Sequence, residues 1–233
     1  MMSTASPYNT LIDSLSPDDR DALLAASVPF DFKVGQIFLE PGDTVEHVYF
    51  VYKGIISAVA AMADGRTVEV FMVGREGVTH PSAATAGAIT SYSRQAAQAD
   101  GQCRRIEVSR LRALADEREG LRAVVSAYAS NLQAELEQSG ACNALHRAEQ
   151  RFAKWLLRCH DRIDGDTLNL TQEYLASMLG SQRTTVNEAA QGLQKTGAIT
   201  YSRGKITIVD RAALERTACE CYNGRTREPA LTA

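Results

Sequence analysis

The residue types best suited to recognising a ligand lie together between Leu170 and Val209, in LTQEYLASMLGSQRTTVNEAAQGLQKTGAITYSRGKITIV. This segment predicts two short helices separated by a glycine, followed by a hairpin. Amide, guanidinium and hydroxyl side chains gather at the start of the second helix, which is the part of a helix that enters the DNA major groove. We therefore expect DNA contacts from Thr171, Gln172, Ser181, Gln182, Arg183, Thr184, Thr185, Asn187, Glu188, Arg203 and Lys205.

Local signals predict the elements that position these side chains. Thr171 is expected to cap a helix over Gln172–Leu179, and Gly180 is expected to end that helix in the left-handed conformation. Ser181 is expected to cap the second helix, which runs to Lys195. A hairpin should follow, with strands over residues 199–201 and 205–209. The alternative is an ordinary helical hairpin, but the added β-hairpin and the polar outward face together favour a winged helix-turn-helix.

Composition and charge are consistent with this interpretation. The chain has 233 residues, of which 45% are hydrophobic and 23% charged, as in a globular protein with two modest domains. Its net charge of −3 is unevenly spread, because residues 147–233 hold 13 Lys and Arg against 10 Asp and Glu, while the rest hold 12 against 18. This asymmetry suits a DNA-binding domain joined to a domain that does not touch phosphates.

The sequence pattern bears on the expected location of the protein. No apolar run approaches the roughly 20 residues that a membrane span needs. The first residues, MMSTASPYNT, lack the basic and apolar blocks of a signal peptide. We therefore expect a cytoplasmic protein without a membrane partner.

The cysteines and histidines do not predict a metal site. The cysteines are odd in number and scattered, which argues against a disulfide framework. Cys219 and Cys221 are closer together than a usual zinc pair and have no second pair, so we interpret them as incidental. The four histidines are dispersed, which favours satisfied or solvated side chains. Nothing resembles a nucleophile elbow, a P-loop or a metal triad, so we expect no catalytic residue and no enzyme.

Upstream, the sequence predicts one helix and then many strands. Ser16-Pro17-Asp18-Asp19 supplies a cap, a proline at the first helical position and acids in the first turn. From Phe30 to Val108, runs of strand-forming residues are separated by turn signals, among them Asp64-Gly65, which readily forms a tight hairpin turn. Several short strands at this spacing predict a barrel or sandwich.

A long helix is expected from about Glu119 to His146, with an apolar stripe at three- and four-residue steps. Such a helix either packs on its own domain or pairs with a second copy, and we favour a dimer because recognition-helix proteins commonly read two-fold sites. The predicted interface residues are Leu121, Val125, Tyr128, Leu132, Leu136 and Ser139.

This layout resembles the Crp/Fnr family of bacterial transcription regulators. Two segments carry the resemblance, GQIFLEPGDTVEHVYFVYKG and LTQEYLASMLGSQRTTVNEAAQGLQKTGAI. It implies an α+β fold with an N-terminal double-stranded, jelly-roll-like β-roll, similar to cyclic-nucleotide-binding domains. It also implies a homodimer that binds a two-fold DNA operator. If the protein activates transcription, the resemblance implies a contact with RNA polymerase. The implied division is a helical segment (1–29), the β-roll sensor (30–118), a dimerisation helix (119–146), the winged helix-turn-helix (147–222) and a flexible tail (223–233).

In the DNA-binding element, the resemblance assigns roles residue by residue. Thr171 and Gln172 match positions that contact the DNA backbone. Arg183 matches an arginine that reads guanine, which a guanidinium does through two parallel hydrogen bonds. Thr184 stands where the best-known members have a glutamate, and Glu188 where they have an arginine. We therefore expect an operator that differs from the standard half-site of the family.

The effector site departs from the family pattern. A cyclic-nucleotide pocket needs backbone amides and an arginine for the phosphate, and a glutamate for the ribose. In the loop from Gly74 to Gln98, Ser93-Arg94-Gln95 replaces the expected Arg-Ser/Thr-Ala signature and His80-Pro81 interrupts the loop. We therefore disfavour a cyclic nucleotide, and a surface loop with a solvated Arg94 is the alternative. The candidate effector residues are Gly74, Glu76, Gly77, Val78, Ser82 and Arg94.

Two classes of function remain. The leading hypothesis is a sequence-specific homodimeric regulator whose β-roll senses an unknown small molecule and acts through the long helix on a recognition helix at about residues 182–196. The alternative is a small-molecule-sensing module that acts on a protein partner and has a degenerate DNA element. The polar helix start and the basic hairpin favour the first. An Fnr-type iron–sulfur cluster is not expected, because no cysteine precedes Cys103.

Overall fold

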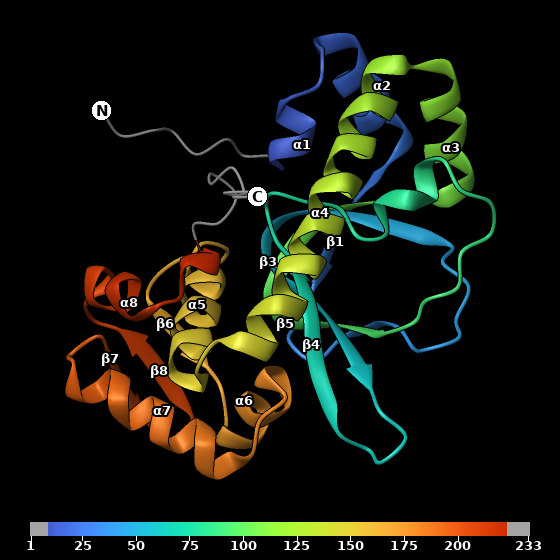
Figure 1. Cartoon of the computed structure of the whole chain (residues 1–233). Helices are drawn as coiled ribbons and strands as arrows, with labels where there is room; N and C mark the ends of the chain where they lie inside the picture. The colour runs from blue at the N-terminus through green and yellow to red at the C-terminus, as the bar shows by residue number, and fades with distance from the viewer. Residues whose placement is uncertain (1–8, 223–233) are drawn as a thin grey trace, which may run out of the picture. The chain divides into compact units, whose positions relative to one another are not determined.

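The computed structural model describes residues 9–222, which form two compact units that we describe separately (Figure 1). Within the described residues, the N-terminal unit takes in 9–65, Glu69–Leu136 and Arg162–Asp164, and the C-terminal unit takes in Arg66–Val68, Glu137–Asp161 and 165–222. The predicted tail over residues 223–233 lies outside the described residues. None of the helices between residues 9 and 222 combines the length and the apolarity that crossing a bilayer requires.

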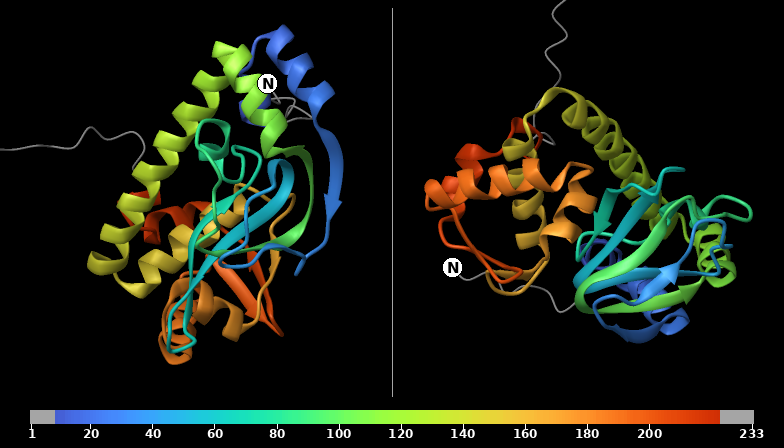
Figure 2. Two further views of the ribbon diagram at one scale, coloured as in Figure 1. Left: turned by 90° about the vertical axis from the view of Figure 1, so that its right-hand side faces the viewer. Right: turned by 90° about the horizontal axis from the view of Figure 1, so that it is seen from below.

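A five-stranded sheet forms the N-terminal unit, in the region where the strand and turn signals predict a barrel or sandwich of short strands. Its strands are β1 (Val28–Phe32), β2 (Ile37–Leu39), β3 (His47–Ala61), β4 (Thr67–Val73) and β5 (Arg94–Glu107). They lie in the order β1-β5-β3-β4, and β2 also pairs with β5; each pairing that involves β5 is antiparallel (Figure 2). Together with the helices this is the α+β fold that the sequence predicts.

The long strands β3 and β5 are irregular near Gly54. Their register shifts between Val51 and Ile56, as at β-bulges, which bend a strand and increase its twist. Gly54 has a φ of +86°, and a Cβ at this position would lie 2.6 Å from the carbonyl oxygen of Asp100. Only glycine meets both requirements, so this residue makes the close approach of the two strands possible.

Five helical elements belong to the N-terminal unit in whole or part: α1 (Thr10–Asp13), α2 (Pro17–Ala26), the 3₁₀ helix η1 (Pro81–Ala84), α3 (Val108–Glu117) and α4 (Glu119–Leu145). Helix α2 begins as predicted, with Ser16 Oγ accepting a hydrogen bond from the Asp19 amide. The sequence interpretation missed α1 and α3. Helix α3 follows Glu107, which makes no side-chain capping bond, so its start carries no cap signal.

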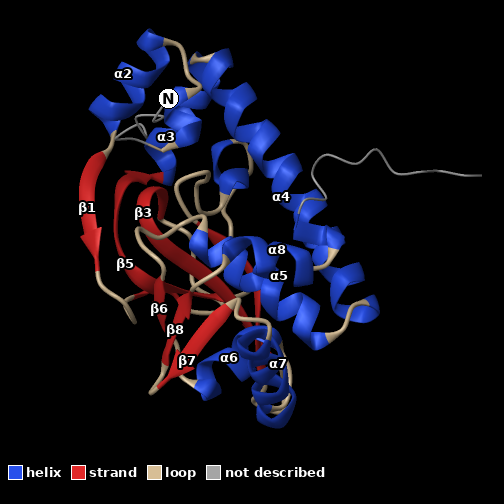
Figure 3. Ribbon diagram, turned by 90° about the vertical axis from the view of Figure 1, so that its left-hand side faces the viewer, coloured by secondary structure: helices blue, strands red, loops and turns tan. Residues whose placement is uncertain are grey.

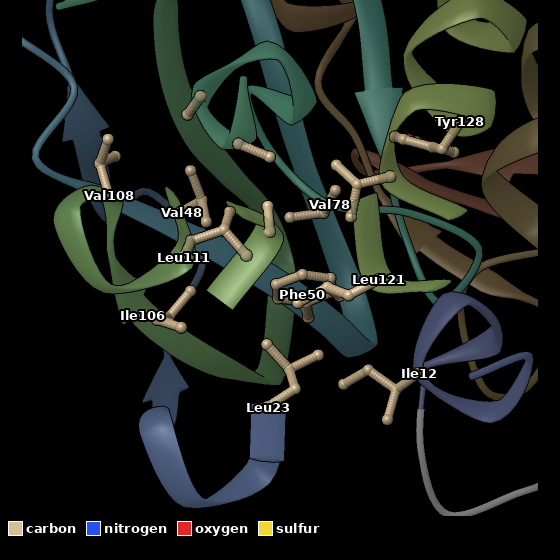
Figure 4. Packing of buried hydrophobic residues seen from close by; sticks show 14 of the residues in the cluster. Ile12, Leu23, Val48, Phe50, Val78, Ile106, Val108, Leu111, Leu121 and Tyr128 are labelled. Carbon is tan, nitrogen blue, oxygen red and sulfur yellow. The ribbon is translucent and has the colours of Figure 1, made fainter. Parts of the chain in front are cut away.

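The main core of this unit lies between the sheet and these helices. Figure 4 shows Phe50 and Val78 packed among residues of α1, α2, α3 and α4. Leu121, Val125 and Tyr128 of α4 belong to this cluster and expose 0%, 1% and 8% of their surface. The first half of the long helix therefore covers the core of its own unit.

The C-terminal unit has the winged helix-turn-helix arrangement that the sequence predicts (Figure 3). Helix α5 (Ala148–His160) buries Phe152, Trp155, Leu156 and Cys159, the face expected from their spacing. A three-stranded sheet has the order β6-β8-β7. The remaining elements in chain order are β6 (Thr167–Asn169), α6 (Gln172–Leu179), α7 (Arg183–Lys195), β7 (Ile199–Ser202), β8 (Lys205–Ile208), α8 (Arg211–Thr217) and η2 (Glu220–Tyr222).

Candidate nucleic-acid interface

Helix α6 starts and ends where its sequence signals place it. Thr171 Oγ1 accepts a hydrogen bond from the Tyr174 amide and satisfies one of the otherwise unpaired donors of the first turn. At the other end Gly180 has a φ of +57°, and its amide bonds back to the last turn. Leu175, Met178 and Leu179 are buried, so the helix is anchored by its apolar face while Thr171 and Gln172 remain exposed.

Ser181 does not cap α7, and this prediction was wrong. The N-cap residue is Gln182, which makes no side-chain capping bond, and the helix begins at Arg183. The Ser181 hydroxyl instead donates to the Leu179 carbonyl oxygen at 3.2 Å and accepts from the Arg151 guanidinium at 3.1 Å. The hydroxyl thus joins the turn to α5 rather than to the start of α7.

Helix α7 buries one face and exposes the polar side chains at its start. Val186, Ala189, Ala190 and Leu193 are buried where α7 packs on α5 and α6. Gln182, Arg183, Thr184 and Glu188 are exposed, while Thr185 and Asn187 are half-buried. The burial pattern therefore turns the predicted recognition side chains towards solvent.

Two surface contacts hold this polar face in place. Arg183 forms an ion pair with Glu173 of α6 at 2.7 Å, and the two side chains are 63% and 78% exposed. Gln172 Nε2 donates to Asn187 Oδ1 at 3.3 Å, which links the starts of the two helices. An ion pair this exposed contributes little to stability, so the guanidinium can exchange its carboxylate partner for another acceptor at low cost.

The β7–β8 hairpin forms the wing, with Arg203 and Gly204 at its tip. Their φ angles of +50° and +74° fit a tight two-residue turn of the primed type. Leu170 fixes the base of the wing, because its amide donates to the Gly204 carbonyl at 2.7 Å and its carbonyl accepts from the Tyr201 hydroxyl at 3.2 Å. Arg203 and Lys205 are exposed, and Arg203 helps to line a hollow of about 450 Å³ together with Thr171, Gln172, Tyr201, Ser202 and Gly204.

The structure does not gather the six candidate effector residues into one pocket. Val78 is fully buried in the core, and an ion pair at 2.7 Å joins Glu76 to Arg162. Arg94 lies on the surface in an ion pair with Glu40 at 2.8 Å. A Cβ at Gly77 would collide with the Tyr128 hydroxyl, which leaves no room for a ligand beside its Cα. Glu76 and Arg94 are thus already paired within the protein.

A cavity of about 360 Å³ adjoins α4 and includes Ser82 alone of those six residues. His80 also lines it, in a left-handed conformation with a φ of +47°. Burial lowers the pKa of His80 to about 4, so the ring is neutral near pH 7. The full lining is Phe71, His80, Pro81, Ser82, Ala129, Ser130, Leu132, Gln133 and Leu136.

The predicted dimer residues divide into two groups. Leu121, Val125 and Tyr128 fill the core of their own unit and are not available to a second chain, so this part of the interface prediction needs correction. Leu132 and Ser139 are half-buried, and Leu136 is 38% exposed. The apolar stripe lies where the sequence predicts it, but residues of the same chain cover most of its first half.

The sequence analysis did not predict that four possible metal ligands lie close together. Cys142 and His146, at the end of α4, meet Cys219 and Cys221, and all four ligand atoms lie within 4.8 Å of one another. The supposedly isolated Cys219 and Cys221 therefore do have a second pair. Hydrogen bonds from Cys219 and His146, together with the Lys154 ammonium, lower the pKa of the Cys142 thiol. The sequence signals were the close spacing of Cys219 and Cys221 and the four-residue step from Cys142 to His146, which places both on one helix face.

Comparisons with known proteins agree with this geometry. Residues 150–217 match the family model of the Crp-like helix-turn-helix domain. Comparison with curated proteins gives no match. Among solved structures, FixK2 from Bradyrhizobium japonicum is 18% identical with a TM-score of 0.69, covering 83% of this chain and 98% of its own.

Two other solved structures resemble the chain over most of its length. The c-di-GMP-responsive global regulator CLP from Xanthomonas campestris is 16% identical with a TM-score of 0.65, covering 84% of this chain and 100% of its own. A Crp/Fnr-family transcriptional regulator from Thermus thermophilus is 23% identical with a TM-score of 0.58, and the match covers 82% of this chain and 98% of that structure. Residues 150–217 are thus a Crp-like helix-turn-helix domain, within a chain that has the fold of the Crp/Fnr transcription regulators.

Proposed function

We propose that the protein is a homodimeric transcription regulator of the Crp/Fnr type that reads specific DNA sequences with α7. The observation that carries this proposal is the exposed polar start of α7, held from behind by buried Val186 and Leu193 and flanked by a basic wing. Each of these features lies in the segment that matches the Crp-like helix-turn-helix domain.

In this proposal the polar side chains of α6, α7 and the wing divide into base-reading and backbone-contacting groups. Arg183 reads a guanine through two parallel hydrogen bonds, once its surface pair with Glu173 opens. Gln182, Thr184, Thr185, Asn187 and Glu188 contact neighbouring base edges or sugar–phosphate groups. Thr171 and Gln172 contact phosphate at the start of α6, where amides point outward. Ser181, Arg203 and Lys205 complete the backbone contacts, which fix register rather than sequence.

The dimer interface of this proposal is the outward face of α4. Ala123, Ala127, Ser130 and Ala134 are all exposed and follow one another at alternating four- and three-residue steps. This is the spacing of a two-helix seam, and small side chains let two helix backbones approach closely. The face lies about half a turn from Leu121 and Val125, so a helix can cover its own core and pair with a second copy at once.

Effector sensing, in this proposal, uses the cavity beside α4. Leu132 and Leu136 of α4 line it together with His80 and Ser82, so a bound small molecule would contact the long helix directly. The lining is mixed apolar and polar, as small-molecule sites commonly are. A cyclic nucleotide stays disfavoured, because Arg94 and Glu76 are held by other side chains. An activator of this kind would also contact RNA polymerase.

DNA binding by the full chain tests the proposal. Operators selected from random duplexes should bind with an affinity that falls about 10³-fold or more between roughly 50 and 200 mM salt, because a dimer displaces many counterions. In Arg183→Ala the discrimination between operator and random DNA should shrink. Lys195→Ala is the matched control, since Lys195 is an exposed cation at the far end of the same helix and should leave discrimination unchanged. A weak, salt-independent response on every duplex would instead favour a module that acts on a protein partner.

A further inference from the structure

The Cys/His cluster, Cys142, His146, Cys219 and Cys221, is the densest group of metal-ligating side chains among the described residues outside the DNA-binding face. Cys142 and His146 are four residues apart where α4 ends, and the His146 amide bonds to the Cys142 carbonyl at 3.1 Å. Cys219 and Cys221 follow α8 and flank Glu220 in η2. All four residues lie in the C-terminal unit, so the cluster is defined within one compact body.

The separations match those of ligands around a single tetrahedral ion. Zinc–sulfur bonds of about 2.3 Å and zinc–nitrogen bonds of about 2.0 Å place neighbouring ligand atoms about 3.5–3.8 Å apart in a tetrahedron. Cys142 Sγ and Cys219 Sγ are 3.6 Å apart, and Cys221 Sγ is 3.6 Å from His146 Nδ1. An iron–sulfur cluster holds its thiolates around several metal atoms and separates them further, so this spacing favours one ion.

Neighbouring charged groups complete the arrangement. His146 Nε2 lies 3.1 Å from Glu220 Oε1, which orients the ring so that Nδ1 faces the cysteines. A carboxylate that binds the outer nitrogen of a liganding histidine is a common support in metal sites. Lys154 Nζ is 3.2 Å from Cys142 Sγ. Three thiolates around a divalent ion leave one negative charge, which this ammonium balances.

Access to the cluster is also consistent with ion binding. Cys142 and Cys219 are buried, whereas His146 and Cys221 are only half-buried. The two outer ligands give an ion a path from solvent, and the two inner thiols shield the bound ion. Three sulfur ligands and one imidazole form a closed site of structural type, and thiolates select zinc over calcium or magnesium.

We propose that the Cys/His cluster binds one zinc ion, through Cys142 Sγ, His146 Nδ1, Cys219 Sγ and Cys221 Sγ. The ion joins the last turn of α4 to the chain that leaves the winged helix after α8. Metal binding in such sites is coupled to folding, so the ion stabilises this end of the C-terminal unit. The proposal does not depend on DNA binding and is tested without it.

Metal analysis of the purified full chain is the first test. Protein isolated under reducing conditions should contain about one equivalent of zinc per chain, and Cys219→Ser and His146→Ala should lose most of it. Cys159→Ala is the matched control, because Cys159 is a buried cysteine of the same unit that lies outside the cluster. Full retention in Cys219→Ser, or a Cys142–Cys219 disulfide in place of bound metal, would overturn the proposal.

Cobalt substitution and one exposed variant keep the test decisive if a cysteine variant fails to fold. Cobalt in the apo-protein should give the visible absorption of a tetrahedral ion with thiolate charge-transfer bands, and added zinc should remove both. Glu220→Gln changes an exposed side chain and should weaken zinc binding by about tenfold without abolishing it. A six-coordinate cobalt spectrum, or none, would contradict the proposed ligand set.

Discussion

Helices α4 and α7 each bury one face and expose the other, but α7 packs on other elements of the helix-turn-helix while the first half of α4 covers the core of the N-terminal unit. For α7 the polar start was expected outside and Val186 and Leu193 inside, as the structure has them. For α4 the stripe from Leu121 to Tyr128 was assigned to a partner chain but fills the core of its own unit. Periodicity shows that a helix has an apolar face, but it does not show what covers that face.

The difference has a physical origin in the length and surroundings of the two helices. Helix α7 is bounded by glycine turns at Gly180 and Gly197, and it packs on α5, α6 and β7, which all lie within about 40 residues of it along the chain. Helix α4 covers a core built from residues as distant as Ile12 and Ile106. The proposed seam on its exposed face consists of alanine and serine, whose weak hydrophobicity leaves little trace in an apolar pattern.

The largest effect is expected inside α4. Leu121→Ala removes a fully buried side chain and should lower the free energy of unfolding by about 2–5 kcal/mol, because a cavity remains. Denaturant unfolding measures this loss. Leu136→Ala is the comparison variant, since that side chain is 38% exposed and should cost about 1 kcal/mol or less. Equal losses in both variants would mean that α4 has no distinct inner face.

On the outward face of α4, a substitution should weaken the dimer and leave the stability of the monomer unchanged. Ala127→Glu places a charge on the proposed seam, and the dimer should dissociate about 100-fold more readily, because like charges then meet across the two-fold axis. Sedimentation velocity over a concentration series measures the change. Unfolding free energy extrapolated to the monomer should stay within about 0.5 kcal/mol of the parent, since Ala127 is exposed.

Two controls separate this result from misfolding. Glu117→Gln, at the end of α3, alters an exposed carboxylate outside the seam and should leave the dimer intact. If Ala127→Glu sediments as a full dimer while Leu132→Glu does not, the interface lies on the flank of α4 that was first expected from the sequence.

The recognition face of α7 should be sensitive to geometry rather than charge. Arg183→Lys keeps the positive charge but loses the planar pair of donors, so discrimination of the guanine position should fall by about 1–3 kcal/mol. Competition between the operator and the same duplex with that base changed measures the loss. The salt slope should stay close to that of the parent, because no phosphate contact is removed. A large change in slope with unchanged discrimination would place Arg183 on the backbone.

Local signals account for most of what the sequence predicted. Caps and turns such as Ser16, Thr171 and Gly180 act within a few residues and were located from the sequence. Helix α3 lacks a capping side chain and was missed. The Cys/His cluster could not be found in this way, because Cys142 and Cys219 are 77 residues apart and meet only through the fold. Chain topology, rather than local propensity, brings such residues together.

His80, which lines the cavity beside α4, should make the stability of the protein depend on pH. Burial holds the pKa of His80 at about 4, below the value of about 6.5 in an unfolded chain. The unfolded state therefore binds a proton first, and the contribution of the neutral ring to stability is present above pH 6.5 and lost as the pH falls towards 4. At pH 5 the loss should be about 1–2 kcal/mol.

His80→Asn removes the titrating group and still tolerates the left-handed backbone. Urea unfolding of both proteins at pH 7 and pH 5 isolates the His80 contribution, because other groups titrate alike in the two. The parent should lose more stability than the variant over this interval. Equal losses would mean that the ring is accessible to solvent and that the cavity wall opens.

The smallest expected effects on stability are those of Thr171, which caps α6, and of Ser181, which does not cap α7. Thr171→Ala removes the acceptor of the Tyr174 amide and should cost about 1 kcal/mol of unfolding free energy. Ser181→Ala removes no capping bond of α7, only the exchangeable bonds of its hydroxyl to the Leu179 carbonyl oxygen and the Arg151 guanidinium, and should cost less. Chemical denaturation of the two variants side by side measures the difference. A larger cost for Ser181→Ala would show that the link to α5, rather than the cap of α6, fixes how α7 presents its polar face.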